Sequence, residues 1–316
     1  MNSRAGQAGF SMLEAIVVFT IVTALTAMIT QSLSSLSSNQ RWSERQSEAL
    51  KKAQVLMDAI GDDLDHAVRV FPECPQSRAL LGLLDLGGIA PSSTSLMPLA
   101  TTRGHFEPDA IGVRETGNLL LIARGETPVV VPTGVGTRTA RIDRYRFVLY
   151  CLNAHGERLD IDRWESATVV RADDLARLMD PDERAGVIMN LFQSGVAIAW
   201  RPDEPDFSQS LFALTRTGTA PRLPPGARIP ADVAPPRREM LSHARLQVAR
   251  NGSGGGVPVP LYAHEFPDYP HGFEIKVDGN GAGRLVYLRL VVRSPEMVDE
   301  RPVQAVVERV ISVREP

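Results

Sequence analysis

The chain has 316 residues and a net charge of −3, with 43% hydrophobic and 22% charged residues. This length can bury a sizeable core, and the slightly acidic balance gives no electrostatic basis for nucleic-acid binding. The two cysteines, Cys74 and Cys151, could form one disulfide bridge if the body of the protein is exported, or they could remain thiols.

A short polar segment, residues 1–9, precedes a long apolar stretch. Arg4 is the only charged residue of the polar segment, and Glu14 is the only one of the apolar stretch. The stretch is long enough to span a bilayer, where a lone carboxylate is costly and suggests a function. A secretory signal carries its small cleavage-site residue after the apolar region, whereas here Gly9 precedes that region and Phe10 follows at once.

This junction resembles the prepilin signal of type IV pilins and of type II secretion pseudopilins at four positions: Gly9, Phe10, Leu13 and Glu14. The resemblance implies that prepilin peptidase cleaves between Gly9 and Phe10 on the cytoplasmic side, and that Phe10 becomes the N-methylated terminus. It also implies an assembly role for Glu14, the fifth mature residue, which in that family pairs with the terminal amine of a neighbouring subunit. Such a pair fixes the register between subunits, because a subunit without its partner leaves an uncompensated charge in an apolar core.

A long N-terminal helix is predicted from about Ser11 to Val70, with the transmembrane or filament-core part in residues 10–33. Small residues recur in this part at three- and four-residue spacing, which suits close helix packing or is ordinary variation in an apolar helix. They are Thr20, Thr23, Ala27 and Thr30. The alternative for the whole stretch is a signal anchor on an unrelated membrane protein, with Glu14 near the headgroups.

The second part of the helix, residues 34–71, is predicted to be amphipathic, with one apolar stripe and charged residues on the other faces. The stripe consists of Leu50, Ala53, Met57, Ile60, Leu64, Ala67 and Phe71. A stripe this narrow usually packs on a sheet or on another helix. Pro72 and Pro75 are expected to end the helix.

The remainder, residues 72–316, is predicted to be an exported, β-rich globular head, so the fold class is α+β with an antiparallel sheet. The clearest hairpin joins residues 273–278 to residues 286–292 through a glycine-rich turn, and a last strand covers residues 304–313. One strand is expected to carry four apolar residues on one face. They are Tyr145, Phe147, Leu149 and Cys151.

Other local signals are weaker. A hairpin is predicted from residues 109–115 and 118–124 around a Thr-Gly turn. A helix is predicted to start at Asp180, with Asp180 as its N-cap and Pro181 in its first turn. Residues 220–236 are rich in proline and indicate a loop or an insertion.

No constellation of residues indicates an enzyme, because the sequence lacks a nucleophile elbow, a phosphate loop and paired-cysteine metal spacing. Asp160 and Asp162 are predicted to be surface residues rather than an acid/base pair. Asp278 and Asn280 could touch calcium, as residues of some pilin relatives do near their C-terminal loops, but the full loop pattern of an EF-hand is absent. Prolines interrupt a further polar cluster, so a solvated loop is favoured there over a metal site. This cluster comprises His264, Glu265, Asp268 and His271.

The resemblance implies a minor pilin or pseudopilin subunit, most like the J-type minor pseudopilin of type II secretion or a W-type minor pilin. Such a subunit lies in the inner membrane as a single-pass protein with a periplasmic head, and it helps to initiate or cap a filament. The implied partners are prepilin peptidase, other minor and major pilins or pseudopilins, and the inner membrane. No cofactor, nucleic acid or enzymatic activity is expected. The alternatives are a membrane-anchored exported enzyme and an adhesin or binding module at a filament tip.

Overall fold

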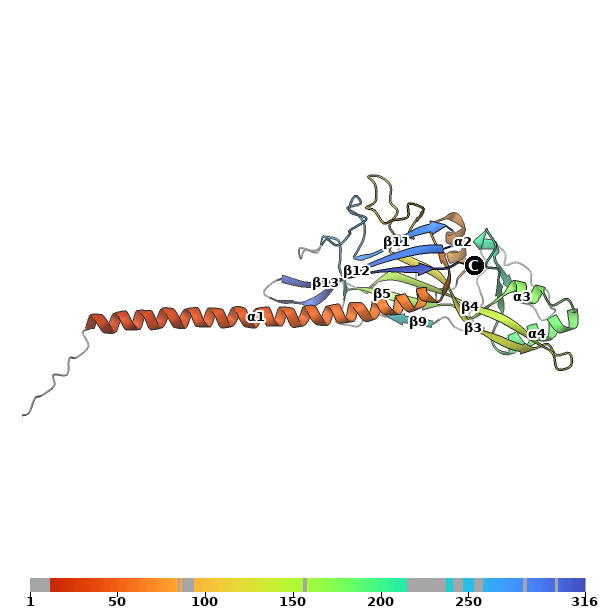
Figure 1. Ribbon diagram of the computed structural model, residues 1–316, viewed down its shortest axis with the longest axis horizontal. Coiled ribbons are helices and arrows are strands. Elements are labelled where there is room, and N and C mark those ends of the chain that lie inside the picture. The colour runs from red at the N-terminus through yellow and green to blue at the C-terminus, as the bar shows by residue number, and fades with distance from the viewer. Residues whose placement is uncertain are drawn as a thin grey trace, which may run out of the picture.

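The computed structural model describes residues 12–84, 86, 94–155, 158–214, 237–240, 247–252, 258–280, 283–298 and 301–315. Residues 1–11, and with them Gly9 and Phe10, lie outside the described residues, as does the proline-rich segment 220–236. The first element is helix α1, Met12–Asp65, whose 54 residues extend over about 80 Å. Its N-terminal half projects away from a β-rich head (Figure 1).

Helix α1 ends at Asp65 and not at about Val70, so the predicted helix over residues 34–71 was wrong at its C-terminal end. The chain turns at His66 and forms strand β1, Ala67–Phe71, which pairs antiparallel with β3, Leu119–Pro132. Val70 and Phe71 suit a strand because of their β-branched and aromatic side chains, and both are fully buried there. Their apolar spacing fitted a helix as well, and the pairing with β3 decides between the two.

Eight strands form the larger sheet, sheet A, in the order β1-β3-β4-β6-β7-β8, with β5 between β4 and β9. The pairings are antiparallel except that of β6 with β7. The other strands of sheet A are β4 Thr139–His155, β5 Arg158–Glu165, β6 Val169–Arg171, β7 Ile198–Trp200, β8 Leu211–Ala213 and β9 Arg237–Met240.

Five strands form sheet B. Strand β12 pairs along one edge with β10 and β11, and along its other edge with β13. Strand β2 pairs with β11. The predicted C-terminal hairpin is confirmed, since Val277 of β11 lies opposite Val286 of β12, and the last predicted strand is β13. The strands are β2 Ala100–Thr101, β10 Gln247–Val248, β11 Phe273–Asn280, β12 Gly283–Val298 and β13 Arg301–Val313.

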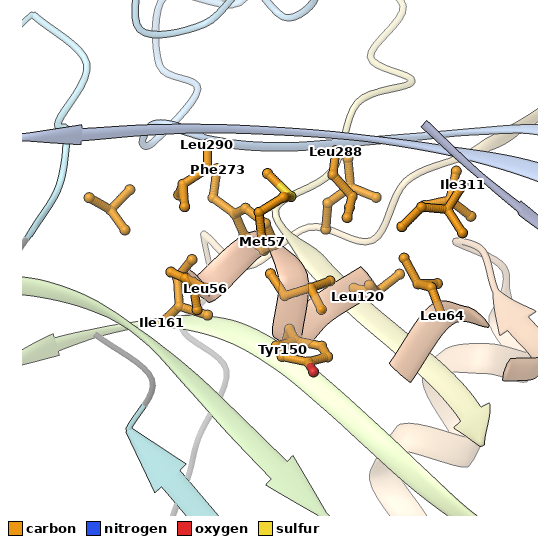
Figure 2. Packing of buried hydrophobic residues seen from close by; sticks show 14 of the residues in the cluster. Leu56, Met57, Leu64, Leu120, Tyr150, Ile161, Phe273, Leu288, Leu290 and Ile311 are labelled. Carbon is orange, nitrogen blue, oxygen red and sulfur yellow. The ribbon is translucent and has the colours of Figure 1, made fainter. Parts of the chain in front are cut away.

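The C-terminal half of α1 lies between the two sheets and is buried from both sides (Figure 2). Leu56, Met57 and Leu64 of the helix are part of one core with side chains of sheet A on one side and of sheet B on the other. The sheet A residues labelled in Figure 2 are Leu120, Tyr150 and Ile161, and those of sheet B are Phe273, Leu288, Leu290 and Ile311. The α+β architecture with a helix on an antiparallel sheet is therefore confirmed, and a second sheet completes the burial of the helix.

The opposite face of sheet A has its own core, beneath helix α2, Pro75–Leu83, and the short helix η1, Phe207–Gln209. This core confirms the predicted apolar face of β4 from Tyr145 to Cys151. Trp200 belongs to this core and makes edge-on contacts with the rings of Tyr145 and Phe147 at centroid distances of 5.1 and 5.3 Å. Such contacts add to the energy of burial and fix β7 on β4.

A third core lies at the end of the head that is remote from the projecting helix (Figure 1). Here α3, Ala172–Ala176, and α4, Pro181–Gln193, pack with the ends of β3 and β4. The predicted helix start is confirmed, because Asp180 accepts a hydrogen bond from the Asp182 amide at 2.9 Å and Pro181 is the first helical residue.

Two predictions in the head were wrong. Residues 109–115 form a loop, not a strand, because the Asp109 carboxylate binds the amides of Glu115 and Thr116 at 3.1 Å and closes the chain on itself. Asp160 and Asp162 are fully buried on β5 and not on the surface. From Asp162 onward β5 is paired with β9, so this part of β5 is not at an edge of the sheet.

Gly186→Ala is expected to lower the free energy of unfolding by about 1–3 kcal/mol, although alanine favours helices. A Cβ atom at Gly186 of α4 would overlap the carbonyl oxygen of Thr133, a backbone atom that cannot rotate away. Gly82→Ala in α2 is the matched control, because its Cβ would meet nothing within 4 Å. Denaturant unfolding of the full chain in detergent measures both, and equal effects would contradict the close approach of α4 to β3.

Candidate functional site

The first half of α1 is an apolar helix with no contact to the head: residues 12–37 are all exposed. In the described part of the chain it is the one helix long and apolar enough to cross a membrane. Its large exposed side chains are Met12, Leu13, Ile16, Val17, Val18, Phe19, Ile21, Val22, Leu25, Met28, Ile29, Leu33 and Leu36. A helix that is apolar on all sides needs lipid or other helices around it.

The threonine hydroxyls of this segment are satisfied within the helix. The hydroxyls of Thr20, Thr23, Thr26 and Thr30 each donate to the carbonyl four residues earlier, at 2.8 Å. These bonds remove the cost of placing a hydroxyl in an apolar environment. Glu14 is in the first turn of α1 and is exposed, and a carboxylate there interacts favourably with the helix dipole.

The helix changes from apolar to polar before it enters the head. Trp42 is exposed, and Glu48 pairs with Lys52 at 2.5 Å and with Arg45 at 3.2 Å. The hydrogen bond with Lys52 and its charge lower the pKa of Glu48. Salt bridges this exposed contribute little to stability but suit a surface in water, so they mark where the membrane-compatible part of α1 ends.

A buried ionic network centred on Asp63 joins the end of α1 to sheet A. Asp63, with 3% of its side chain exposed, binds Arg163 at 2.8 Å and Arg124 at 2.9 Å, and it accepts a hydrogen bond from the Tyr150 hydroxyl. Burial lowers the pKa of the Arg163 guanidinium, but its hydrogen bonds with Asp63 outweigh this, and the net shift is upward. Burial, reinforced by the Asp63 charge, raises the pKa of Tyr150. The sequence pattern placed Asp63 only on a charged face and did not reveal this role.

The outer face of sheet B carries buried charges that the sequence did not predict. Glu274 of β11 binds Arg289 of β12 at 2.9 Å and also accepts hydrogen bonds from the amides of Leu261, Tyr262 and Ala263. The loop that contains these amides therefore covers part of the sheet. Glu274, one of the polar residues that alternate with apolar ones in β11, is therefore buried under this loop.

The residues considered for a metal site do not gather around one point. His264 pairs with its neighbour Glu265 at 2.8 Å, and Asp268 is exposed. His271 forms an isolated antiparallel β-bridge with Arg250. No group of three His, Cys, Asp or Glu residues suited to a metal ion occurs among the described residues.

Asp278 and Asn280, the two residues considered for calcium, differ in burial and in their contacts. Asp278 is buried and accepts hydrogen bonds from the Thr101 hydroxyl at 2.8 Å and the Arg103 amide at 2.9 Å. Asn280 is exposed at the end of β11. Asp278 therefore holds the chain after β2 against β11.

His271 is expected to make stability depend on pH. Burial, with a smaller effect of Arg250, lowers its pKa from 6.5 to about 4. As the pH falls below 6.5, the unfolded chain takes up this proton first, so the stability present above pH 6.5 is lost by about pH 4. His271→Gln should therefore make the unfolding midpoint depend less on pH over that range. Denaturant-unfolding midpoints measured between pH 7 and pH 4 test this expectation. If the midpoint changed with pH to the same extent in wild type and in His271→Gln, the expectation would be contradicted.

The structure has both cysteines as thiols, so the bridge between Cys74 and Cys151 is not formed. Cys74 is instead the N-cap of α2: its sulfur accepts a hydrogen bond from the Ser77 amide at 3.3 Å and lies 3.0 Å from the Ser77 hydroxyl. Cys151 is buried in the core beneath α2. The capping contact turns the Cys74 side chain to its own helix, which sequence spacing alone could not indicate.

The architecture is therefore a long N-terminal helix with an exposed apolar half, followed by a two-sheet head into whose core the C-terminal part of the helix packs. No protein-family model matches the chain, and no match was found among curated proteins or solved structures. The case for a function therefore depends on the residues and the geometry of this chain alone.

Proposed function

We propose that the protein is a minor subunit of a type IV pilin-like filament, held in the inner membrane by α1 with its head exported. One observation carries the proposal: a Gly-Phe junction stands just before α1, Glu14 lies in the first turn of α1, and the first half of this helix is exposed on every side. The C-terminal part of the helix, from Ala49 to Leu64, packs its apolar face into the core of the head. The first half is thus available for lipid before assembly and for the helices of other subunits afterwards.

The side chains of the first half of α1 support a transfer of this segment from lipid to contacts with other helices. In lipid, helices associate through close packing and not through the hydrophobic effect, and small residues favour close approach. Thr20, Thr23, Ala27 and Thr30 provide such a surface, and their exposure leaves it accessible. Glu14 would pair with the terminal amine of an adjacent subunit and so set the axial offset between the two.

The size of the head favours a minor subunit over a major one. We propose a J-type minor pseudopilin of type II secretion or a W-type minor pilin, which helps to initiate or cap the filament. Its partners would be prepilin peptidase and other pilins or pseudopilins. The peptidase and the methylation step would act on this chain, which would itself be a structural component.

Cleavage between Gly9 and Phe10, with N-methylation of Phe10, is the expected result of processing, and it tests the proposal. Gly9→Leu should block cleavage, because a small residue is required there, and should leave membrane insertion intact. Gly6→Leu is the matched control within the same polar segment and should be cleaved as wild type. Mass spectrometry of the N-terminal peptide from the membrane fraction gives the result. An uncut Met1, or a terminus beyond the apolar segment, would refute the assignment.

A further inference from the structure

A buried lysine on the outer face of sheet B has no part in the proposed function. Lys276 of β11 lies against Asp109 and Glu115, which belong to the loop that follows β2. The side chains of Lys276, Asp109 and Glu115 are 3%, 0% and 9% exposed. A primary amine is therefore held out of water against two carboxyl groups that are distant from it in sequence.

The geometry orients one of these carboxyl groups toward the amine. Lys276 Nζ lies 2.8 Å from Asp109 Oδ1 and 3.3 Å from Glu115 Oε2, and it donates to the Glu107 carbonyl at 2.7 Å. Asp109 Oδ2 accepts the amides of Glu115 and Thr116, both at 3.1 Å, and Oδ1 accepts the Thr116 hydroxyl at 3.0 Å. Fixed donors on both oxygens hold the carboxyl plane still beside the nucleophile. Two backbone amides at one oxygen are also the arrangement that stabilises an oxyanion during attack on a carbonyl carbon.

We propose that Lys276 and Asp109 join in an intramolecular isopeptide bond, with Glu115 as the proton carrier. Glu115 takes a proton from the Lys276 ammonium, and the neutral amine attacks Asp109 Cγ. The developing negative charge lies on Oδ2, at the two amides. A C–N bond forms and the Cγ–Oδ1 bond breaks. Oδ1 leaves as water with two protons from Nζ, one of them delivered by Glu115, and no oxidant or other reactant is needed.

The charges around the site favour the neutral product. Before the reaction the cations of Lys276 and Arg103 face the anions of Asp109 and Glu115. Afterwards Arg103 and Glu115 remain as a pair at 2.7 Å, so no buried charge loses its partner. The product amide removes two charges from an interior where they are costly to desolvate.

The surroundings also limit reversal by water. The ring of Tyr262 lies 5.4 Å from Nζ, and this ring packs edge-on against Tyr287 at 4.8 Å. Exclusion of water protects a bond formed by condensation. The bond would link positions 167 apart in the chain and hold the loop after β2 permanently on β11.

Peptide mapping of the full-length protein, purified in detergent, tests the bond. The expected result is one branched peptide that contains Asp109 and Lys276, with a mass lower by one water than the sum of the two linear peptides. Lys276→Arg keeps the cation but should yield only linear peptides. Glu115→Gln should also lack the branched peptide, because glutamine cannot carry the proton.

Glu107→Gln is the matched control, since its side chain is half exposed and only its carbonyl contacts Lys276; it should keep the branched peptide. Recovery of linear peptides alone from the wild type would overturn the proposal, and this measurement does not depend on whether a variant folds. A branched peptide in Glu115→Gln at the wild-type level would overturn the role of Glu115.

Discussion

Asp63→Ala is expected to destabilise the protein by about 3–5 kcal/mol, the usual cost of breaking a buried ion pair from one side. The substitution removes the carboxylate that holds Arg163 at 2.8 Å and leaves this side chain, 12% exposed, with Glu165 at 2.6 Å as its remaining ionic partner. Arg124 and Tyr150 lose the same partner. Because these groups come from β3, β4 and β5, the end of α1 loses its polar attachment to sheet A.

Denaturant unfolding of the full chain in detergent measures the change. Asp62→Ala is the matched control on the preceding residue, whose side chain is 62% exposed and reaches Arg124 only at 3.4 Å, and its effect should stay within about 0.5 kcal/mol. An Asp63→Leu/Arg163→Leu double variant should recover part of the loss, because apolar pairs often replace buried ion pairs well. Equal effects of Asp63→Ala and Asp62→Ala would show that the buried network does not hold the helix.

Sequence patterns predicted those elements whose structure depends on residues close together in the chain. The alternation in residues 273–292 predicted the hairpin of β11 and β12, and the residues at 180–181 predicted the start of α4. The apolar length before Trp42 predicted the exposed half of α1. In each case a short stretch of sequence contains both the pattern and its physical cause.

The features that were missed depend on contacts between distant segments. Residues 67–71 fit a helical stripe and a strand equally, and only the partner strand β3 selects the strand. Lys276 alternates with apolar residues, as on an exposed face, yet a loop from before β3 covers it. The apolar stripe of α1 indicated one packing surface, but a second sheet, built from the C-terminal part of the chain, encloses the helix.

The candidate site has one part that is local in sequence, whose role stays a prediction, and one part that is not local. Gly9, Phe10 and Glu14 belong to a short motif that can be read without a structure. Asp63 is one of several acids on a helix and nothing in the local sequence distinguishes it from Asp62. Its three partners come from strands far along the chain.

Glu14→Leu is expected to leave membrane insertion and cleavage after Gly9 unchanged, because neither step needs the charge. Incorporation beside neighbouring subunits should fall about tenfold or more, which corresponds to a loss of ~1.4 kcal/mol or more. The reason is that the terminal amine of the neighbour would be buried among apolar helices without a carboxylate. Glu14→Gln should have a similar effect, since an amide keeps the size but not the charge.

The measurement is cross-linking to the other minor subunits, scored together with filament number or secretion, in cells with wild-type amounts of protein. Glu44→Leu is the matched control, because Glu44 is exposed on the same helix but beyond its apolar half. It should cross-link as wild type. If Glu14→Leu also gave wild-type cross-linking and filament number, the carboxylate would have no role in assembly. Loss of incorporation in Glu14→Leu alone would instead locate the assembly signal in the first turn of α1, where the apolar helix begins.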